Sequence, residues 1–173
     1  MQLSKSIILI GMPGSGKTTV GKILAKRYGV QFKDTDNLIK ATTGEALQVT
    51  LDKCGRDKFL DTENKVLLGI NPDKPMIIAT GGSAVLHKEA MEHLRSIGTV
   101  VFLDADLPLI RKRLWNMESR GIVFAEGEDE SILAVYSERE PMYYKYSDIR
   151  VHIRGKTVES TAESIIKAIE SNH

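Results

Sequence analysis

Residues 6–19 read S-I-I-L-I-G-M-P-G-S-G-K-T-T, and this stretch decides the fold. An apolar run over residues 7–10 stops at Gly11, and apolar residues recur at helical spacing after Lys17. The order is therefore a strand, a tight turn and a helix. Residues 11–18 fit G-x-x-x-x-G-K-[ST], the phosphate-binding loop, in the structural context that this motif requires. A glycine-rich turn without a ligand would need neither the lysine nor the hydroxyl at these positions.

The residue types of this loop suit a polyphosphate. Gly11, Gly14 and Gly16 permit backbone angles that other residues avoid, so successive N–H groups can converge on one anion. The helix that begins near Gly16 adds its unpaired N–H groups and the positive end of its dipole. Lys17 supplies a full charge for the β- and γ-phosphates, and the hydroxyl of Thr18 is placed to ligate Mg²⁺.

The composition is that of a single domain over residues 1–173, which is long enough for a sizeable core and short for two domains. Because the formal net charge is only +1, nothing favours nucleic acid or an anionic membrane as a partner. The lone Cys54 excludes an internal disulfide and suits a reducing compartment. No signal peptide is recognisable, and no apolar run approaches the ~18 residues of a membrane span. We expect a cytoplasmic monomer.

Strand-like apolar runs alternate with helical patterns along the chain. This alternation predicts a three-layer α/β/α fold of the P-loop NTPase type, in which helices cover both faces of a five-stranded parallel sheet. Ligands of such sheets bind at the carboxyl ends of the strands, so functional residues should directly follow each run. The runs cover residues 7–10, 76–79, 99–103 and 149–153, with a weaker one at 30–33.

Two carboxylates follow the run at 30–33 in the sequence D-T-D, residues 34–36. An extended chain points residues i and i+2 to the same side, so Asp34 and Asp36 can face one mouth. Asp34 suits an outer contact to the water shell of Mg²⁺, and Asp36 suits a substrate hydroxyl, as hydrogen-bond acceptor or base. Either residue also suits the N-cap of a helix that starts near Asn37, and the two functions are compatible.

Three further features are candidates for the site. The pair Gly81 and Gly82 follows the run at 76–79, where a ligand can approach the backbone N–H donors closely. Arg113 belongs to a basic trio in a helix that Asp106 caps, and it suits either an adenine ring or a solvated face. Glu63 lies near the inner face of a helix within residues 54–69, although charged helix residues are usually solvated.

The stretch from 117 to 130 is irregular, contains glycine and lies between helical patterns. It predicts a mobile lid that closes over the phosphates, with Arg120 bringing positive charge to the transferring phosphoryl group. Two capping boxes indicate helix starts elsewhere, and they pair Thr42 with Glu45 and Ser160 with Glu163.

Taken together, these motifs resemble those of the shikimate kinases along nearly the whole chain. The phosphate loop alone is shared by many unrelated ATPases and GTPases, but the other motifs, in this order and at these separations, are far more restrictive. The markers are G-M-P-G-S-G-K-T at 11–18, D-T-D at 34–36, F-x-x-x-E at 59–63, T-G-G at 80–82, Arg120, and R-E-P-x-Y at 139–143.

The resemblance implies the fold of the nucleoside monophosphate kinases and transfer of the γ-phosphoryl group of ATP to a substrate hydroxyl. It implies that residues 14–19, Ser15 and Thr19 among them, hold the ATP phosphates. It also implies that Thr18 and, more distantly, Asp34 hold Mg²⁺.

For the acceptor, the same resemblance implies that Asp36 meets the attacking hydroxyl and that Arg139 takes the carboxylate of shikimate, with Gly82 binding the rest of the molecule. Arg120 would close onto ATP, and Arg113 would lie near adenine.

The chain departs from the family pattern at three positions. The family usually has an arginine that grips the shikimate carboxylate where this chain has Leu60, and losing one such partner weakens binding on the order of 10- to 100-fold. The third glycine after the strand is Ser83, and Gly121 stands where proline usually follows the flap arginine. Arg56 or Lys58 would have to replace the missing guanidinium from different helix positions.

Two alternatives therefore remain beside a shikimate kinase. Leu60 favours a related kinase for a different small hydroxy acid or polyol. A nucleotide-binding switch that phosphorylates nothing is the third interpretation, but Asp36, Arg120 and Arg139 are more than a bare nucleotide site requires.

Overall fold

The computed structural model describes residues 2–114, 122 and 131–171. Within these residues, five strands form one parallel sheet in the order β2-β3-β1-β4-β5. The predicted sheet is confirmed, and the weakest of the predicted strands begins two residues later than expected. The strands are β1 (Ser6–Ile10), β2 (Phe32–Asp34), β3 (Ile77–Ala79), β4 (Gly98–Asp104) and β5 (Ile149–His152).

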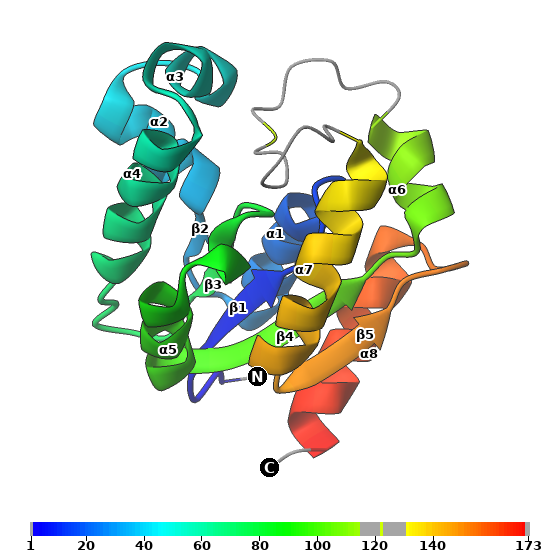
Figure 1. Ribbon diagram of the computed structural model, residues 1–173. Coiled ribbons are helices and arrows are strands. Elements are labelled where there is room, and N and C mark those ends of the chain that lie inside the picture. The colour runs from blue at the N-terminus through cyan, green and yellow to red at the C-terminus, as the bar shows by residue number, and fades with distance from the viewer. Residues whose placement is uncertain (1, 115–121, 123–130, 172–173) are drawn as a thin grey trace.

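Helices cover both faces of this sheet, as the alternation of patterns predicts (Figure 1). α1 and α8 pack against each other on one face, with α1 against β1 and β3 and α8 against β5, whereas α5 and α7 pack against β4 on the other. The helices are α1 (Lys17–Tyr28), α2 (Thr35–Thr43), α3 (Leu47–Cys54), α4 (Arg56–Leu68), the short 3₁₀ helix η1 (Ala84–Leu86), α5 (Lys88–Ile97), α6 (Leu107–Leu114), α7 (Ile132–Tyr146) and α8 (Val158–Ser171).

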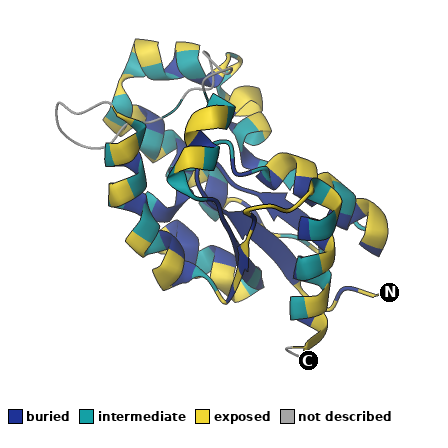
Figure 2. Cartoon of the chain, turned by 90° about the vertical axis from the view of Figure 1, so that its right-hand side faces the viewer, coloured by how far each residue is buried: buried dark blue, intermediate teal, exposed yellow. Residues whose placement is uncertain are grey.

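The central strands are mostly apolar because both of their faces are covered. All residues of β1 and β3 are buried, and Leu9 and Val101 are completely inaccessible. Figure 2 shows the strands as buried and the exposed residues on the outer sides of the helices. The edge strand β5 instead alternates buried and exposed residues, since only part of it is covered. Burial of this apolar surface is the main stabilising contribution to the fold.

α2, α3 and α4 form a separate group beside β2, at the carboxyl end of the sheet (Figure 1). Ile39, Leu47 and Phe59, one from each helix, make a small apolar cluster of their own. The predicted capping box of Thr42 and Glu45 is wrong. Gly44 adopts a left-handed conformation that ends α2, and the Thr42 hydroxyl donates to the carbonyl of Leu38 within that helix.

Two other predicted helix starts have different outcomes. The hydroxyl of Thr157 accepts a hydrogen bond from the N–H of Ser160 at 3.1 Å, so α8 begins at Val158 and the predicted box of Ser160 and Glu163 is wrong. Asp106 does cap α6, because its carboxylate accepts from the N–H of Leu109 at 3.2 Å.

In the described part of the chain, no helix has the length and apolarity needed to cross a membrane.

The strand register brings the functional segments to one edge of the sheet. Ala79 at the end of β3 lies beside Leu9 of β1 and Asp34 of β2. The chain that follows each of these three strands therefore emerges at the same edge, which is the ligand-binding edge of such sheets.

Candidate active site

The phosphate loop is a tight turn between β1 and α1, held by its own backbone. The N–H of Ser15 donates to the carbonyl of Met12 at 3.1 Å, and Gly16 caps α1 at φ 96°, a left-handed angle that a side chain would strain. The ammonium of Lys17 donates to the carbonyls of Gly11 and Met12 at 2.7 and 2.8 Å. The lysine charge thus lies over the loop, near the N-terminal end of α1, which is the positive end of the helix dipole.

Asp34 joins the loop to the acidic segment. Its carboxylate accepts from the Thr18 hydroxyl at 2.7 Å and from the N–H of Asp36 at 3.0 Å. The second of these contacts makes Asp34 the N-cap of α2, so capping and contact to the loop fall on the same residue. A hydroxyl and a carboxylate side by side are the hard oxygen ligands that Mg²⁺ prefers, with water and phosphate oxygens completing the shell.

Asp36 is a carboxylate in an unfavourable place for a negative charge. Its pKa is raised from 3.8 to about 6, mainly by burial and also by the charges of Asp34 and Glu63, while Lys17 and Lys40 partly oppose the shift. A carboxyl group with a pKa close to neutrality is suited to accept a proton.

The glycine pair approaches the other site residues very closely. The N–H of Gly81 donates to the hydroxyl of Thr35, and a Cβ atom at Gly81 would lie 2.9 Å from both Asp36 Oδ1 and Glu63 Oε1. A side chain at this position would therefore displace both carboxylates. The carbonyl of Gly82 accepts from the Tyr143 hydroxyl at 2.7 Å, which ties this loop to α7.

Arg139 brings a positive charge to the same region from α7. Only 1% of its surface is exposed, and its Nε lies 3.7 Å from the carboxylate of Glu138. The neighbouring Tyr143 on the same helix stacks on Phe102 of β4 with ring centroids 5.0 Å apart, so this part of α7 is firmly packed on the sheet.

One cavity of about 630 Å³ connects these groups at the carboxyl edge of the sheet. The guanidinium of Arg113 donates to the carbonyl of Gly14 at 2.9 Å, which places it against the phosphate loop in this structure. Gly11 and Asp34 are not part of the wall, but they contact Lys17 and Thr18, which line it. The predicted site residues that line the cavity are residues 14–19, Asp36, Gly81, Gly82, Arg113 and Arg139.

Sequence reasoning missed part of the cavity wall near the glycine pair. Glu63, for which a solvated position was the favoured interpretation, has 1% of its surface exposed and lines the cavity. Ser83, noted only as a departure, donates its hydroxyl to Glu63 at 2.7 and 2.9 Å. His87, which no motif indicated, lies with Nε2 2.8 Å from Glu63 Oε2. The position of Glu63 on the same face as Phe59 and Leu67 was the available signal for its burial.

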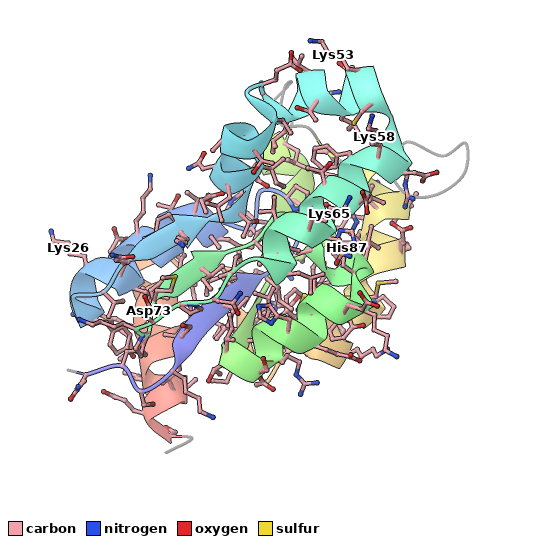
Figure 3. The ribbon with its side chains drawn as sticks, turned by 90° about the vertical axis from the view of Figure 1, so that its left-hand side faces the viewer. Lys26, Lys53, Lys58, Lys65, Asp73 and His87 are labelled. Atoms are coloured by element: carbon pink, nitrogen blue, oxygen red, sulfur yellow. The ribbon has the colours of Figure 1, made fainter. Side chains whose placement is uncertain are left out.

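The residues around Leu60 border a second, smaller cavity of about 360 Å³ between α4, η1 and α7. Arg56 lies in that cavity and pairs with Glu138 at 3.6 Å, so it does not reach the larger one. Lys58 is exposed on the outside of α4 (Figure 3). Neither residue replaces the guanidinium that the family has at position 60.

The predicted lid over residues 117–130 lies outside the described residues, except for Ile122, which lines the larger cavity. Arg120 and Gly121 lie outside them as well, so the role of this arginine stays a prediction.

Comparison with known proteins identifies the family. A family model described as shikimate kinase matches residues 13–170. The chain belongs to the shikimate kinase family. A shikimate kinase of Thermodesulfovibrio yellowstonii is 38% identical over 166 residues, which cover 96% of this chain and 95% of the relative. A shikimate kinase of Caldanaerobacter subterraneus is 32% identical, with 95% of each chain covered.

Solved structures agree with this assignment. A shikimate kinase from Acinetobacter baumannii, determined in complex with shikimate, superimposes with a TM-score of 0.88 at 29% identity and covers 97% of this chain and 94% of its own. A sugar kinase from Janibacter has a TM-score of 0.65 at 16% identity, which shows a shared fold only. The predicted P-loop kinase fold and the resemblance drawn from the motifs are thereby confirmed.

Proposed function

We propose that this protein transfers the γ-phosphoryl group of ATP to a hydroxyl of shikimate. Membership of the family supports this proposal. The observation that carries it is the single cavity in which a phosphate loop at one end meets a buried carboxylate, a glycine pair and a buried arginine at the other. ATP and acceptor can therefore bind side by side with the two reacting groups facing each other.

At the nucleotide end, the loop amides and the Lys17 ammonium bind the phosphates of ATP. Lys17 exchanges its bonds to the carbonyls of Gly11 and Met12 for phosphate oxygens, and these carbonyls hold it at the loop beforehand. Thr18 would hold Mg²⁺, with Asp34 behind it in contact with the water shell, because their adjacent oxygens fit this ion. The ion, when bound, neutralises charge on the β- and γ-phosphates.

At the acceptor end, Asp36 accepts the proton of the attacking hydroxyl as that oxygen bonds to the γ-phosphorus and the bond to the β-phosphate oxygen breaks. The pKa of about 6, raised mainly by burial, leaves Asp36 ionised at neutral pH and yet basic enough to take the proton. Arg139 binds the carboxylate of the acceptor, and Gly81 and Gly82 leave room for its ring. Most of the catalysis comes from positioning and charge stabilisation.

The test is release of ADP from ATP in the presence of shikimate, with phosphorylated product identified by mass spectrometry. The blank is Lys17→Ala, which removes the phosphate-binding charge. We expect turnover by the wild type and loss of it in the blank. ADP release that does not depend on shikimate, at millimolar concentrations of the acid, would contradict the proposal.

A second candidate function is phosphorylation of a different small hydroxy acid or polyol. The observation that favours it is Leu60, which carries no positive charge and borders the smaller cavity. A panel of hydroxylated acids and polyols in the same assay decides between the candidates, since the true acceptor gives the highest kcat/KM. We also infer that the enzyme acts as a cytoplasmic monomer. Analytical sedimentation at the concentration of the assay tests the oligomeric state.

A further inference from the structure

Glu63 is a buried carboxylate whose own helix gives it no partner. Its neighbours one turn away on α4 are Phe59, Leu60, Val66 and Leu67, and all four are apolar. A carboxylate with 1% of its surface exposed is costly unless hydrogen-bond donors or a cation replace the lost water. The partners of Glu63 must therefore come from another element.

Those partners come from the segment that follows the glycine pair. Ser83 has one hydroxyl proton, which it shares between the two carboxylate oxygens at 2.7 and 2.9 Å. An ionised carboxylate only accepts hydrogen bonds, so the ring nitrogen of His87 at 2.8 Å from Oε2 carries the proton that it donates.

The three residues form a wall between the two cavities. Glu63 and Ser83 line the larger cavity, whereas His87 lines the smaller one and reaches Glu63 from behind. Figure 3 shows His87 between α4 and the chain that leads into α5. The other charged groups that line the smaller cavity are Arg56 and Asp61 of α4 and Glu138 of α7.

The front of the wall faces the acceptor. Glu63 Oε1 and Asp36 Oδ1 both lie 2.9 Å from the point where a Cβ of Gly81 would stand, so the two oxygens border the same small space. A rotation of Glu63 would change the shape and charge of the space beside the proposed base. Donors behind Glu63 hold it in the orientation that the structure shows.

We propose that His87, with help from Ser83, is a positioning residue for the acceptor: it holds the Glu63 carboxylate so that Oε1 faces the acceptor hydroxyls beside Asp36. This inference rests on the proposed function. His87 touches neither acceptor nor nucleotide and acts only through Glu63. Its loss should therefore weaken acceptor binding and leave the phosphate loop unaffected.

The experiment compares His87→Phe, which removes the donor, with His87→Gln, whose side-chain amide can still donate to Glu63. His93→Phe is the matched control, because His93 makes one ring-nitrogen contact of the same length, to the carbonyl of Ile70 on the outside of the cavity. With shikimate as acceptor, we expect His87→Phe to raise its KM on the order of tenfold, as for loss of one charge-assisted hydrogen bond. The KM for ATP stays within about twofold.

His87→Gln should recover most of the wild-type KM, and His93→Phe should leave it unchanged. An unchanged KM in His87→Phe, or an equal rise in the phenylalanine and glutamine variants, would overturn the proposal. If His87→Phe does not melt cooperatively, Ser83→Ala serves instead, with an expected rise of about threefold. A normal KM in that variant would then overturn the proposal.

Imidazole ¹⁵N signals separate this inference from the proposed function. The His87 signals should shift in Glu63→Gln, whereas the His93 signals should not. Unchanged His87 signals would contradict the pair whatever the acceptor is. If the wild type does not phosphorylate shikimate but the His87 signals shift in Glu63→Gln, the proposed acceptor is wrong and the contact between His87 and Glu63 is supported. The KM comparison is then made with the best acceptor of the panel.

Discussion

The two ends of the active-site cavity are built in different ways. The nucleotide end consists of backbone amides and carbonyls, closed by glycine angles and by Lys17 bonding to the carbonyls of Gly11 and Met12. The acceptor end consists of charged side chains from three separate segments, with Asp36 on α2, Glu63 on α4 and Arg139 on α7, of which Glu63 and Arg139 are buried. One end depends on local chain geometry, and the other depends on how distant elements pack.

This difference determines which substitutions each end can tolerate during evolution. A backbone site can bind any substrate that carries a triphosphate, and almost any substitution of its glycines lowers the affinity. A side-chain site can exchange one hydrogen-bonding partner for another. Leu60 and Ser83 illustrate this, because a family arginine is absent at one position and the hydroxyl at the other donates to Glu63.

The largest effect should come from the residue where the two ends meet. We predict that Asp36→Asn lowers kcat on the order of 10²- to 10⁴-fold, because the amide cannot accept the proton of the attacking hydroxyl. The dissociation constant for ATP should change less than about threefold, since the nucleotide end forms its contacts locally. Initial rates and calorimetric titration with Mg·ATP provide the two measurements. Equal losses in both would show that the ends are not separable.

The same contrast decides how far the sequence predicts the site. The loop at 11–18 is local, so residue types at fixed offsets were sufficient to place it. The sequence left the helix cap open between Asp34 and Asp36, and the structure places it at Asp34. The sheet followed from apolar runs that are covered on both faces. The glycine pair was found from its position directly after a strand, whereas Arg139 was found through the family motifs, because no local pattern marks a buried arginine in a helix.

The Glu63 network could not be predicted in this way. Ser83 lies 20 residues from Glu63 and His87 lies 24 residues away, and the packing of η1 and α5 against α4 brings them together. The helix starts near Glu45 and Ser160 were wrong for a related reason. Thr42 and Ser160 do belong to helices, but Gly44 and Thr157 fixed the boundaries at other residues.

The next prediction tests whether the lid arginine belongs to the nucleotide end or to the transferring group. We expect Arg120→Ala to lower kcat on the order of 10²- to 10³-fold and to weaken ATP binding by less than about tenfold, because its charge should act mainly in the transition state. Arg111→Ala, which removes an exposed arginine of α6, is the control. A large loss of ATP affinity with little change in kcat would assign Arg120 to ground-state nucleotide binding.

The acceptor end should also reduce the stability of the fold at neutral pH. Since the folded pKa of Asp36 is about 6 and the unfolded value is 3.8, the folded state binds the proton more tightly. Stability therefore decreases as the pH rises from about 4 to 6, and the full penalty remains above 6. We predict that the free energy of unfolding of Asp36→Asn is about 1–3 kcal/mol higher than that of the wild type at pH 8, and that the two values are equal below pH 4.

Urea denaturation across this pH range, without nucleotide or Mg²⁺, measures the gain. Asp73→Asn is the control, because Asp73 is an exposed loop residue (Figure 3). A gain that is independent of pH, or equal in the two variants, would show that Asp36 ionises in the folded protein as it does in water.

The smallest effect concerns the position that distinguishes this chain within its family. Residues 60 and 63 are neighbours on one face of α4, so an arginine at 60 can reach both Glu63 and the acceptor end of the cavity. We predict that Leu60→Arg lowers the KM for shikimate by about tenfold, as one charge-assisted contact to its carboxylate is gained. The control is Leu60→Gln, which introduces a polar side chain without charge. The logarithm of its KM should fall by less than half as much.

Combining this change with the His87 variants sharpens the comparison. If arginine at 60 becomes a further hydrogen-bond donor to Glu63, then His87→Phe should raise the KM less in the Leu60→Arg background than in the wild type, because the carboxylate keeps a partner. Equal effects in both backgrounds would show that the arginine binds the acceptor without touching Glu63. An unchanged or raised KM in Leu60→Arg alone would mean that this acceptor end recognises a molecule without a carboxylate at that place, and that the substitution at 60 marks a change of substrate.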